Sequence, residues 1–384
     1  MAWFMSGPSD VVIVGGGVIG LSIAYRLARE GVLSTLLDRR DVGREASWAG
    51  AGMIPANTER LRTNPSVELR SWSAVLYPEW SAALLEETGI DNGYRRTGGV
   101  DLAFTEDEDR ELRSTAGRWK GEGIVFERLA PDDFRRVEPA LSPEVRSAYF
   151  LPDRAQIRNP RHLQALAAAS VNRGVVVRED VTVNGFETRA GRILAARLSS
   201  GLLPCGTLVL AAGAWTGGLI EGLGLNVPTP PVKGQIVLLK PDQPLLKRIV
   251  EYGRHYLVPR DDGRVLIGST EEDAGFDTRS TPIGVRDLID VALRLCPVLA
   301  SASVEKTWAG LRPGSLDTRP YIGPLPGFSN LFVASGHKRA GLQLSTATAE
   351  LIADLVLGRA PRIDLTPFRP DREPATGDQE VFRS

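Results

Sequence analysis

Near the start of the chain, three glycines and one aspartate have the types and spacing that bind a dinucleotide. Gly15, Gly17 and Gly20 follow the apolar run 11–14, and Asp38 stands 18 positions after Gly20. Gly15 permits a tight turn, Gly17 leaves room for a pyrophosphate, and Gly20 lets a helix lie close to the preceding strand. The helix start favours bound phosphate because its N–H groups are unpaired, and the carboxylate of Asp38 can accept hydrogen bonds from an unphosphorylated ribose.

A βαβ unit must position these residues, because the motif lies between two apolar segments with a helical pattern after it. Further along, Trp72, Leu76, Trp80 and Leu84 recur at a spacing of four, which predicts a helix with one face in the core. Other strands are expected at 98–104, 174–177, 181–183, 208–215, 235–239, 255–259, 264–268 and 330–336, and other helices at 162–171, 282–295 and 346–357. The run 44–53 consists largely of small residues and has no clear helical or strand period. A second glycine-bounded loop, 336–341, follows a strand and precedes a helix start, which makes it another favourable place for an anion.

Composition and charge exclude several classes of protein. The 384 residues carry a formal net charge of -1, which provides no electrostatic footprint for nucleic acid or for an anionic membrane. No window approaches an apolar span long enough for a membrane and no secretory segment is recognisable, so we expect a cytoplasmic protein. Cys205 and Cys296 are too few for a disulfide framework and lack metal-ligand spacing. We expect both to be small buried residues and expect no metal site.

The chain resembles the glycine oxidase (ThiO-like) branch of the D-amino-acid oxidase family of FAD-dependent oxidoreductases over roughly residues 10–360. The segments that carry the resemblance are VVIVGGGVIGLSIAYRLAREG, REASWAGAGMIP, RTGGVDLAF, YLVPRDDGRVLIGST, WAGLRPGSLDTRPYIGPLP and NLFVASGHKRAGLQLSTATAELIADL. The glycine motif alone does not separate FAD from NAD, but the resemblance implies FAD. It also implies an α/β (α+β) protein with two discontinuous domains, a Rossmann-like FAD-binding domain and an antiparallel-sheet substrate domain.

The alternation of segments along the chain agrees with two intertwined domains. We assign residues 10–88, 157–225 and 306–365 to the FAD-binding domain and residues 89–156 and 226–305 to the substrate-binding domain. Residues 1–9 and 366–384 are expected to be flexible tails.

The resemblance implies a set of FAD-binding residues spread over the chain. They are Gly15, Gly17, Val18, Ile19 and Gly20 at the pyrophosphate, Asp38 and Arg39 at the ribose, Ala46, Ser47, Ala51, Gly52 and Met53 along the flavin, Val183 at the adenine, and His337, Lys338, Arg339, Ala340, Gly341, Leu342 and Gln343 around the flavin pyrimidine edge. Relatives that bind flavin covalently use a cysteine near residues 311–313, where this chain has none. The FAD is therefore expected to be non-covalent.

Three residues are implied to act on the substrate. Arg312 matches the arginine that binds the substrate carboxylate, Tyr256 the tyrosine beside it, and Arg339 a second arginine close to the substrate. Each has a purely structural alternative, which is an ion pair with Asp317 for Arg312, core packing for Tyr256 and an interdomain salt bridge for Arg339. Met53, Lys338 and Ala340, together with Tyr256, are expected to set the volume of the substrate pocket. Lys338 departs from the family pattern, and its side chain either assists the reaction with oxygen or points to solvent.

The implied reaction is oxidation of glycine and small amines or D-amino acids, such as sarcosine and D-alanine. A hydride passes to flavin N5, and the products are a 2-oxo acid, ammonia and hydrogen peroxide. The implied partners are the amino-acid substrate and dioxygen, in a homo-dimer or homo-tetramer, and a link to thiamine biosynthesis is expected by resemblance. Two alternatives stay open: a dehydrogenase of the same family that passes electrons to a quinone or a protein, and an accessory flavin subunit without catalysis.

Overall fold

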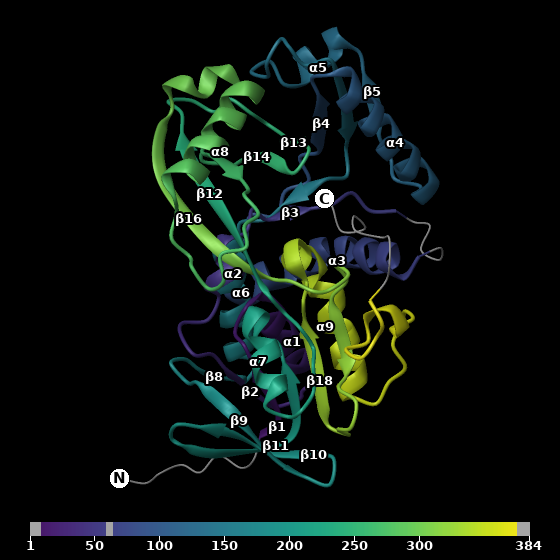
Figure 1. Cartoon of the computed structure of the whole chain (residues 1–384), viewed down its shortest axis with the longest axis vertical. Coiled ribbons are helices and arrows are strands. Elements are labelled where there is room, and N and C mark those ends of the chain that lie inside the picture. Colours follow the sequence, from purple (N-terminus) through teal and green to yellow (C-terminus); the bar gives the residue numbers. More distant parts are fainter. Residues whose placement is uncertain (1–8, 59–63, 375–384) are drawn as a thin grey trace.

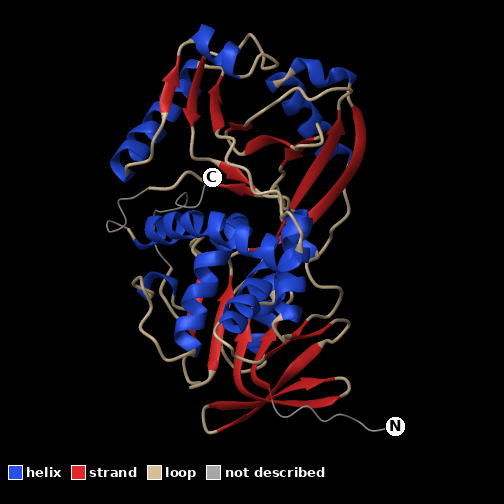
Figure 2. Cartoon of the chain, turned by 180° about the vertical axis from the view of Figure 1, so that it is seen from behind, coloured by secondary structure: helices blue, strands red, loops and turns tan. Residues whose placement is uncertain are grey.

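Two large β-sheets lie at opposite ends of the molecule, in a computed structural model that describes residues 9–58 and 64–374 (Figure 1). Each of the two sheets contains eight of the strands in these ranges. Helices fill the region between the sheets, as the view from behind shows (Figure 2). The mixed α/β class and the two-sheet arrangement predicted from the sequence are confirmed.

The first sheet is the dinucleotide-binding sheet. Its strands are β1 (Ser9–Val14), β2 (Ser34–Leu37), β8 (Val176–Arg178), β9 (Val183–Arg189), β10 (Arg192–Leu198), β11 (Gly201–Leu210), β17 (Tyr321–Pro324) and β18 (Leu331–Ser335). The order is β17-β18-β11-β1-β2-β8, parallel except for β17, with β9 and β10 added as an antiparallel extension of β11. In β1, Val11 and Ile13 belong to one core cluster and Val12 and Val14 to another. The strand is continuously apolar because both of its faces are covered.

Four helices contribute to the core cluster on one face of this sheet: α1 (Val18–Arg29), α3 (Pro65–Thr88), α6 (Asn159–Asn172) and α9 (Gly341–Val356). The helical face predicted in α3 is confirmed, since Trp72, Trp80 and Leu84 are buried in that core and Leu76 packs against it. The helix begins at Pro65 because the side chain of Asn64 accepts the Ser66 N–H at 2.9 Å.

The second sheet is mainly antiparallel. Its strands are β4 (Gly99–Ala103), β5 (Glu127–Leu129), β6 (Ser147–Leu151), β12 (Pro231–Lys240), β13 (Ile249–Tyr252), β14 (His255–Pro259), β15 (Val265–Gly268) and β16 (Ser303–Pro313). The order is β16-β12-β15-β14-β13-β4-β6-β5, and only the β13–β4 pair of these described strands is parallel. The helix α8 (Pro282–Leu295) shares a core with β12 and β15. The helices α4 (Glu106–Glu122) and α5 (Pro131–Val137) lie near β4, β5 and β6 (Figure 1).

Short elements join the two halves. The strands β3 (Met53–Ile54) and β7 (Ala155–Gln156) form a two-stranded sheet near the middle of the molecule (Figure 1). The run 44–53, for which no period was expected, contains the short helix α2 (Glu45–Ala49). The strand expected at 208–215 ends at residue 210 and is followed by a 3-10 turn at 213–215 and by α7 (Thr216–Glu221). Because these segments are short or rich in glycine and other small residues, periodicity along the chain did not predict their secondary structure.

Three expected boundaries differ from the structure. The boundary at residue 306 falls inside β16, which pairs with β12 along its length, so Arg312 belongs to the second sheet. The expected C-terminal tail is ordered through residue 374, because Phe368 is buried in the core and Arg372 contacts Asp317 at 2.6 Å. Ser9 is the first residue of β1, whereas residues 1–8 and 375–384 lie outside the described ranges. With the boundary moved to 314, the division into two domains remains our proposal.

Cys205 and Cys296 are both buried and free, as predicted. No helix in the described ranges is long and apolar enough to cross a membrane.

Candidate active site

A cavity of about 1040 Å³ collects most of the residues that the sequence assigned to a site. Its walls include the turn after β1, the segment around α2, the loop before α9 and the facing strands of the second sheet. Of the expected residues, only Gly20 and Ala340 are absent from its lining. Both are buried in packing contacts, and their expected contact with FAD, like the expected effect of Ala340 on the pocket volume, remains a prediction.

The glycine turn at the end of β1 has no room for side chains. Gly15 has a φ of 110°, and a Cβ there would overlap the backbone of Ala211. A Cβ on Gly20 would overlap the carbonyl oxygen of Gly15, which is why α1 can pack so closely on the strand. Gly17 caps α1 without a side-chain hydrogen bond, and Ser47 Oγ accepts the Val18 N–H at 2.9 Å. The turn thus presents backbone, rather than side chains, to the cavity.

Asp38 organises this turn. One carboxylate oxygen accepts the Gly16 N–H at 2.7 Å, and the other accepts the Arg40 N–H at 2.9 Å. Burial raises the pKa of Asp38 above its ordinary value, although these two hydrogen bonds oppose the shift. Beside it, the Arg39 guanidinium lies 3.6 Å from the ring centroid of Trp215, which also lines the cavity. This cation–π contact forms one wall of the cavity at the Asp38 end.

The α2 segment is pressed against the second sheet. The side chain of Asn159 donates to the Ser47 carbonyl at 2.7 Å, and the Trp308 indole N–H donates to the Ala49 carbonyl at 3.1 Å. A Cβ on Gly310 would lie 2.6 Å from Ala49 Cβ, so the glycine lets β16 approach α2. These contacts hold the segment 46–53, most of whose residues are small, in place along the cavity.

The loop before α9 forms another wall of the cavity. His337 is buried, and its Nε2 lies 3.1 Å from Thr348 Oγ1. Lys338 has a φ of 45°, in the left-handed region that residues other than glycine rarely adopt. The helix α9 starts at Gly341, five residues before the expected start at 346, so its amino terminus faces the cavity.

Arg312 is the most distinctive side chain of the cavity. It is partly buried on β16 and donates to the Thr270 carbonyl at 3.1 Å, to the Lys233 carbonyl at 3.4 Å and to Ser269 Oγ at 2.5 Å. Burial lowers its pKa, yet a guanidinium remains charged in proteins. None of its hydrogen bonds within the described ranges goes to a carboxylate. The suggested partner Asp317 contacts Arg372 instead.

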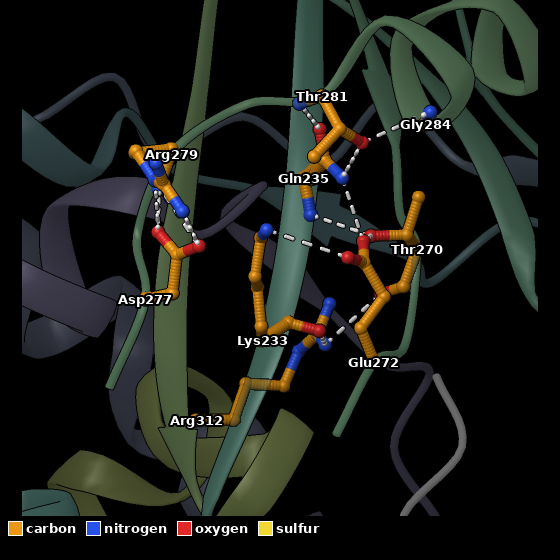
Figure 3. Close-up of polar contacts among 9 residues, drawn as sticks. All are labelled: Lys233, Gln235, Thr270, Glu272, Asp277, Arg279, Thr281, Gly284 and Arg312. Carbon is orange, nitrogen blue, oxygen red and sulfur yellow. Dashed lines mark hydrogen bonds and ion pairs between the residues drawn. The ribbon is translucent and has the colours of Figure 1, made fainter. Parts of the chain in front are cut away.

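A polar network behind Arg312 holds the two carbonyls that accept from it (Figure 3). The carboxylate of Glu272 accepts from Gln235 Nε2 at 2.7 Å and from Thr270 Oγ1 at 2.5 Å, and lies 3.4 Å from Lys233 Nζ. Lys233 and Glu272 also exchange backbone hydrogen bonds of 3.0 and 2.9 Å. The guanidinium lies against the backbone of Gly234, where an added Cβ would overlap it.

The other two substrate candidates lie on the same cavity. Tyr256 is buried on β14, and its ring lies across Gly268, where a Cβ would overlap the hydroxyl. Arg339 donates to the Arg254 carbonyl at 2.9 Å and lies 3.9 Å from Glu271, so it does make a contact between the two halves. Lys338 Nζ lies 2.9 Å from Glu271, and its side chain is therefore paired rather than turned to open solvent.

Comparison with known proteins agrees with this geometry. The family model described as "DAO: FAD dependent oxidoreductase" matches residues 10–355. The glycine oxidase of Pseudomonas putida is 38% identical over 364 residues, covering 94% of this chain and 98% of that protein. The crystal structure of glycine oxidase from Geobacillus kaustophilus has a TM-score of 0.91 at 34% identity, covering 95% of this chain and 99% of that one.

The chain belongs to the FAD-dependent oxidoreductase family. The resemblance to its glycine oxidase branch is confirmed, and the protein is an FAD-dependent enzyme of amino-acid oxidation. The bifunctional protein ThiO/ThiG of Synechocystis is 34% identical over 98% of this chain, which matches 56% of that protein.

The cavity residues fit FAD, the cofactor of this family. The side-chain-free turn at Gly15 and Gly17 suits a pyrophosphate, Asp38 suits the ribose, and the backbone wall at 46–53 suits a flat ring system. Cys205 and Cys296 do not line the cavity, so neither could hold the flavin covalently.

Several residues of the cavity were missed by sequence reasoning. They include Asn159, Trp215, Gly234, Arg254 and Ser269. A signal existed for Trp215, because it follows the carboxyl end of a parallel strand, where ligands of open α/β sheets bind. The others come from the second sheet or from α6, and only the folding of those segments brings them to the cavity.

Gly234→Ala tests the position of the Arg312 guanidinium. The new Cβ would overlap that group, and misplacement of a binding group can lower kcat/KM by roughly 10²-fold. We expect this loss with the FAD content unchanged, as measured by steady-state kinetics and visible absorbance. The control is Gly121→Ala in α4, where a Cβ meets nothing within 4 Å. Equal kinetics for the two variants would contradict the proposed position.

Two buried histidines predict how stability depends on pH. Burial lowers the pKa of both His162 and His337 to about 3. The unfolded chain takes up protons on them below a pH of about 6.5, whereas the folded chain does not, so stability falls by about 1.4 kcal/mol per pH unit for each histidine. The loss continues until the pH reaches the folded-state values near 3. We expect the melting temperature to fall from about pH 6 to pH 5, above the range where most carboxylates titrate, and His162→Gln to flatten that fall. An unchanged slope in the variant would contradict the assignment to His162.

Proposed function

We propose that the protein catalyses oxidative deamination of glycine and of other small amines or D-amino acids, such as sarcosine and D-alanine. The observation that supports this most is Arg312. It is a partly buried cation on the cavity wall whose described hydrogen bonds go only to carbonyls and a hydroxyl. A cation in such surroundings gains from an anionic partner, and the carboxylate of an amino acid would provide one.

The side chains of the second sheet would bind and orient this substrate. Arg312 would hold the carboxylate by two parallel hydrogen bonds, a charge-assisted contact worth roughly 1.5–3 kcal/mol. Tyr256, across Gly268, would support the same carboxylate through its hydroxyl. Arg339 would add positive charge on the side of the α9 loop. With the carboxylate held, the α-carbon is positioned by geometry, and no side chain needs to remove a proton from carbon.

The glycine turn, Asp38 and the segment 46–53 would hold FAD, which would supply a hydride acceptor at its N5 and would be reoxidised by dioxygen with formation of hydrogen peroxide. The chain's own contribution would be to bind the amine in its neutral form and to present the α9 amino terminus, whose N–H groups favour negative charge, to the cavity. The resulting imine leaves and is hydrolysed to a 2-oxo acid and ammonia.

The residues that limit substrate size would be Met53, Tyr256 and Lys338, which line the cavity. Substrates that differ by one apolar carbon are separated by only about 1–3 kcal/mol in a pocket. We therefore propose a group of small amines rather than one of them.

The test is to mix the purified protein without oxygen with glycine, sarcosine and a panel of D- and L-amino acids, and to follow the visible flavin absorbance. Bleaching by glycine or D-alanine that air reverses, with peroxide formed, is the expected result. Bleaching that air does not reverse would favour the dehydrogenase, and a flavin that no amine bleaches would favour the accessory subunit. Light scattering on the same sample tests the proposed homo-dimer or homo-tetramer.

A further inference from the structure

An ionic cluster at the rim of the cavity joins the two halves of the protein. Glu271, on the loop after β15, lies 2.9 Å from Lys338 Nζ and 3.9 Å from Arg339. The three side chains are 29%, 25% and 26% exposed, so solvent screens them only in part. We name Glu271, Lys338 and Arg339 the rim cluster.

The two cations of the rim cluster also line the cavity, together with Arg312. Glu271 itself is not among the residues that line the cavity, so its carboxylate pairs from outside the lining with cations that the cavity presents. Burial opposes its ionisation, but the hydrogen bond from Lys338 and the charges of Lys338, Arg339 and Arg312 together lower the pKa of Glu271 below its ordinary value. Near neutral pH the chain itself thus supplies one negative charge to these cations.

We propose that Glu271 is a specificity-determining residue that excludes amines with a second carboxylate. A monocarboxylic substrate places its one carboxylate at Arg312, whereas a second carboxylate would have to bind Lys338 and Arg339, which Glu271 already holds. The inference rests on the proposed function for the identity of the substrates. Its physical basis, competition between two carboxylates for the same cations, can be measured without turnover.

The chain offers a matched control on the same loop. Asp273 is exposed, and no ion pair to it is found among the described side chains. Glu271→Gln and Asp273→Asn each remove one negative charge two residues apart, but only the first removes the carboxylate from the rim cluster. A general change in net charge would therefore affect both variants equally.

The experiment measures binding of acetate and malonate to the FAD-loaded protein at low ionic strength, by calorimetry and by the shift in flavin absorbance. Glu271→Gln should lower the Kd of malonate relative to acetate by roughly tenfold, and Asp273→Asn by less than about twofold. Adding Lys338→Met to Glu271→Gln should abolish the gain. An unchanged ratio in Glu271→Gln, or an equal change in Asp273→Asn, would overturn the proposal. Glu271→Ala is the second variant if the glutamine variant does not fold.

Measurements of turnover distinguish a failure of this inference from a failure of the proposed function. In Glu271→Gln, kcat/KM for D-aspartate relative to D-alanine should rise by roughly tenfold. If the wild-type protein oxidises D-alanine but the ratio does not move, the specificity inference fails alone. If no amine is oxidised, the proposed function fails, and the malonate measurement still decides the part played by Glu271.

Discussion

Replacing Arg312 by alanine should raise KM for the amino-acid substrate by roughly 10- to 100-fold, the loss expected when a contact of about 1.5–3 kcal/mol to a charged group is removed. The FAD content should not change, because Arg312 lies on β16 of the second sheet, away from the glycine turn. Arg312→Lys should restore only part of the affinity, since an ammonium keeps the charge but lacks the planar fork of donors. Steady-state kinetics with glycine, at matched FAD content, measures both effects.

The matched control for this prediction is Arg264→Ala. Arg264 pairs with Glu305 at 2.7 Å on the same sheet and does not line the cavity. Arg264→Ala removes one positive charge, as Arg312→Ala does, but removes it outside the cavity. Unchanged kinetics in Arg312→Ala, or an equal loss in Arg264→Ala, would remove Arg312 from the substrate site.

Gly20→Ala should release FAD and destabilise the protein, although the substitution adds one methyl group. The new Cβ would overlap the carbonyl oxygen of Gly15, so α1 must move away from β1 and distort the turn that forms one end of the cavity. Overpacking of this kind costs about 1–3 kcal/mol. We expect a lower melting temperature and loss of flavin during gel filtration.

The control substitutes another helical glycine. Gly117 lies in α4, where a Cβ meets nothing within 4 Å, so Gly117→Ala should keep FAD and stabilise the helix by about 0.5–1 kcal/mol. Retention of FAD by Gly20→Ala with an unchanged melting temperature would show that the close helix–strand contact is dispensable.

The structure bears on the structural alternatives expected for Arg312 and Arg339, and the functions of both residues remain proposals. Asp317, offered as a partner for Arg312, contacts Arg372 of the segment expected to be a tail. Arg339 contacts Glu271 and Arg254 in the other half of the protein. A contact between the two halves is what the structural alternative for Arg339, an interdomain salt bridge, predicted. It also lines the cavity, so contact between the halves and contact with substrate do not exclude each other.

The sequence alone determined the dinucleotide turn and the helices with a strong apolar period, because each depends on residues close together in the chain. It also determined the family, through several such local segments between residues 10 and 360. Gly15, Gly17 and Asp38 act through local backbone geometry, which their types and spacing express directly. Only the tertiary structure decided that Ala340 packs in the core, that α9 begins at Gly341 and that Glu271 reaches Lys338. It also decided that Arg312 lies on the second sheet against Gly234. These facts depend on pairings between distant segments, and neither residue type nor periodicity along one segment specifies which partner the other segment brings.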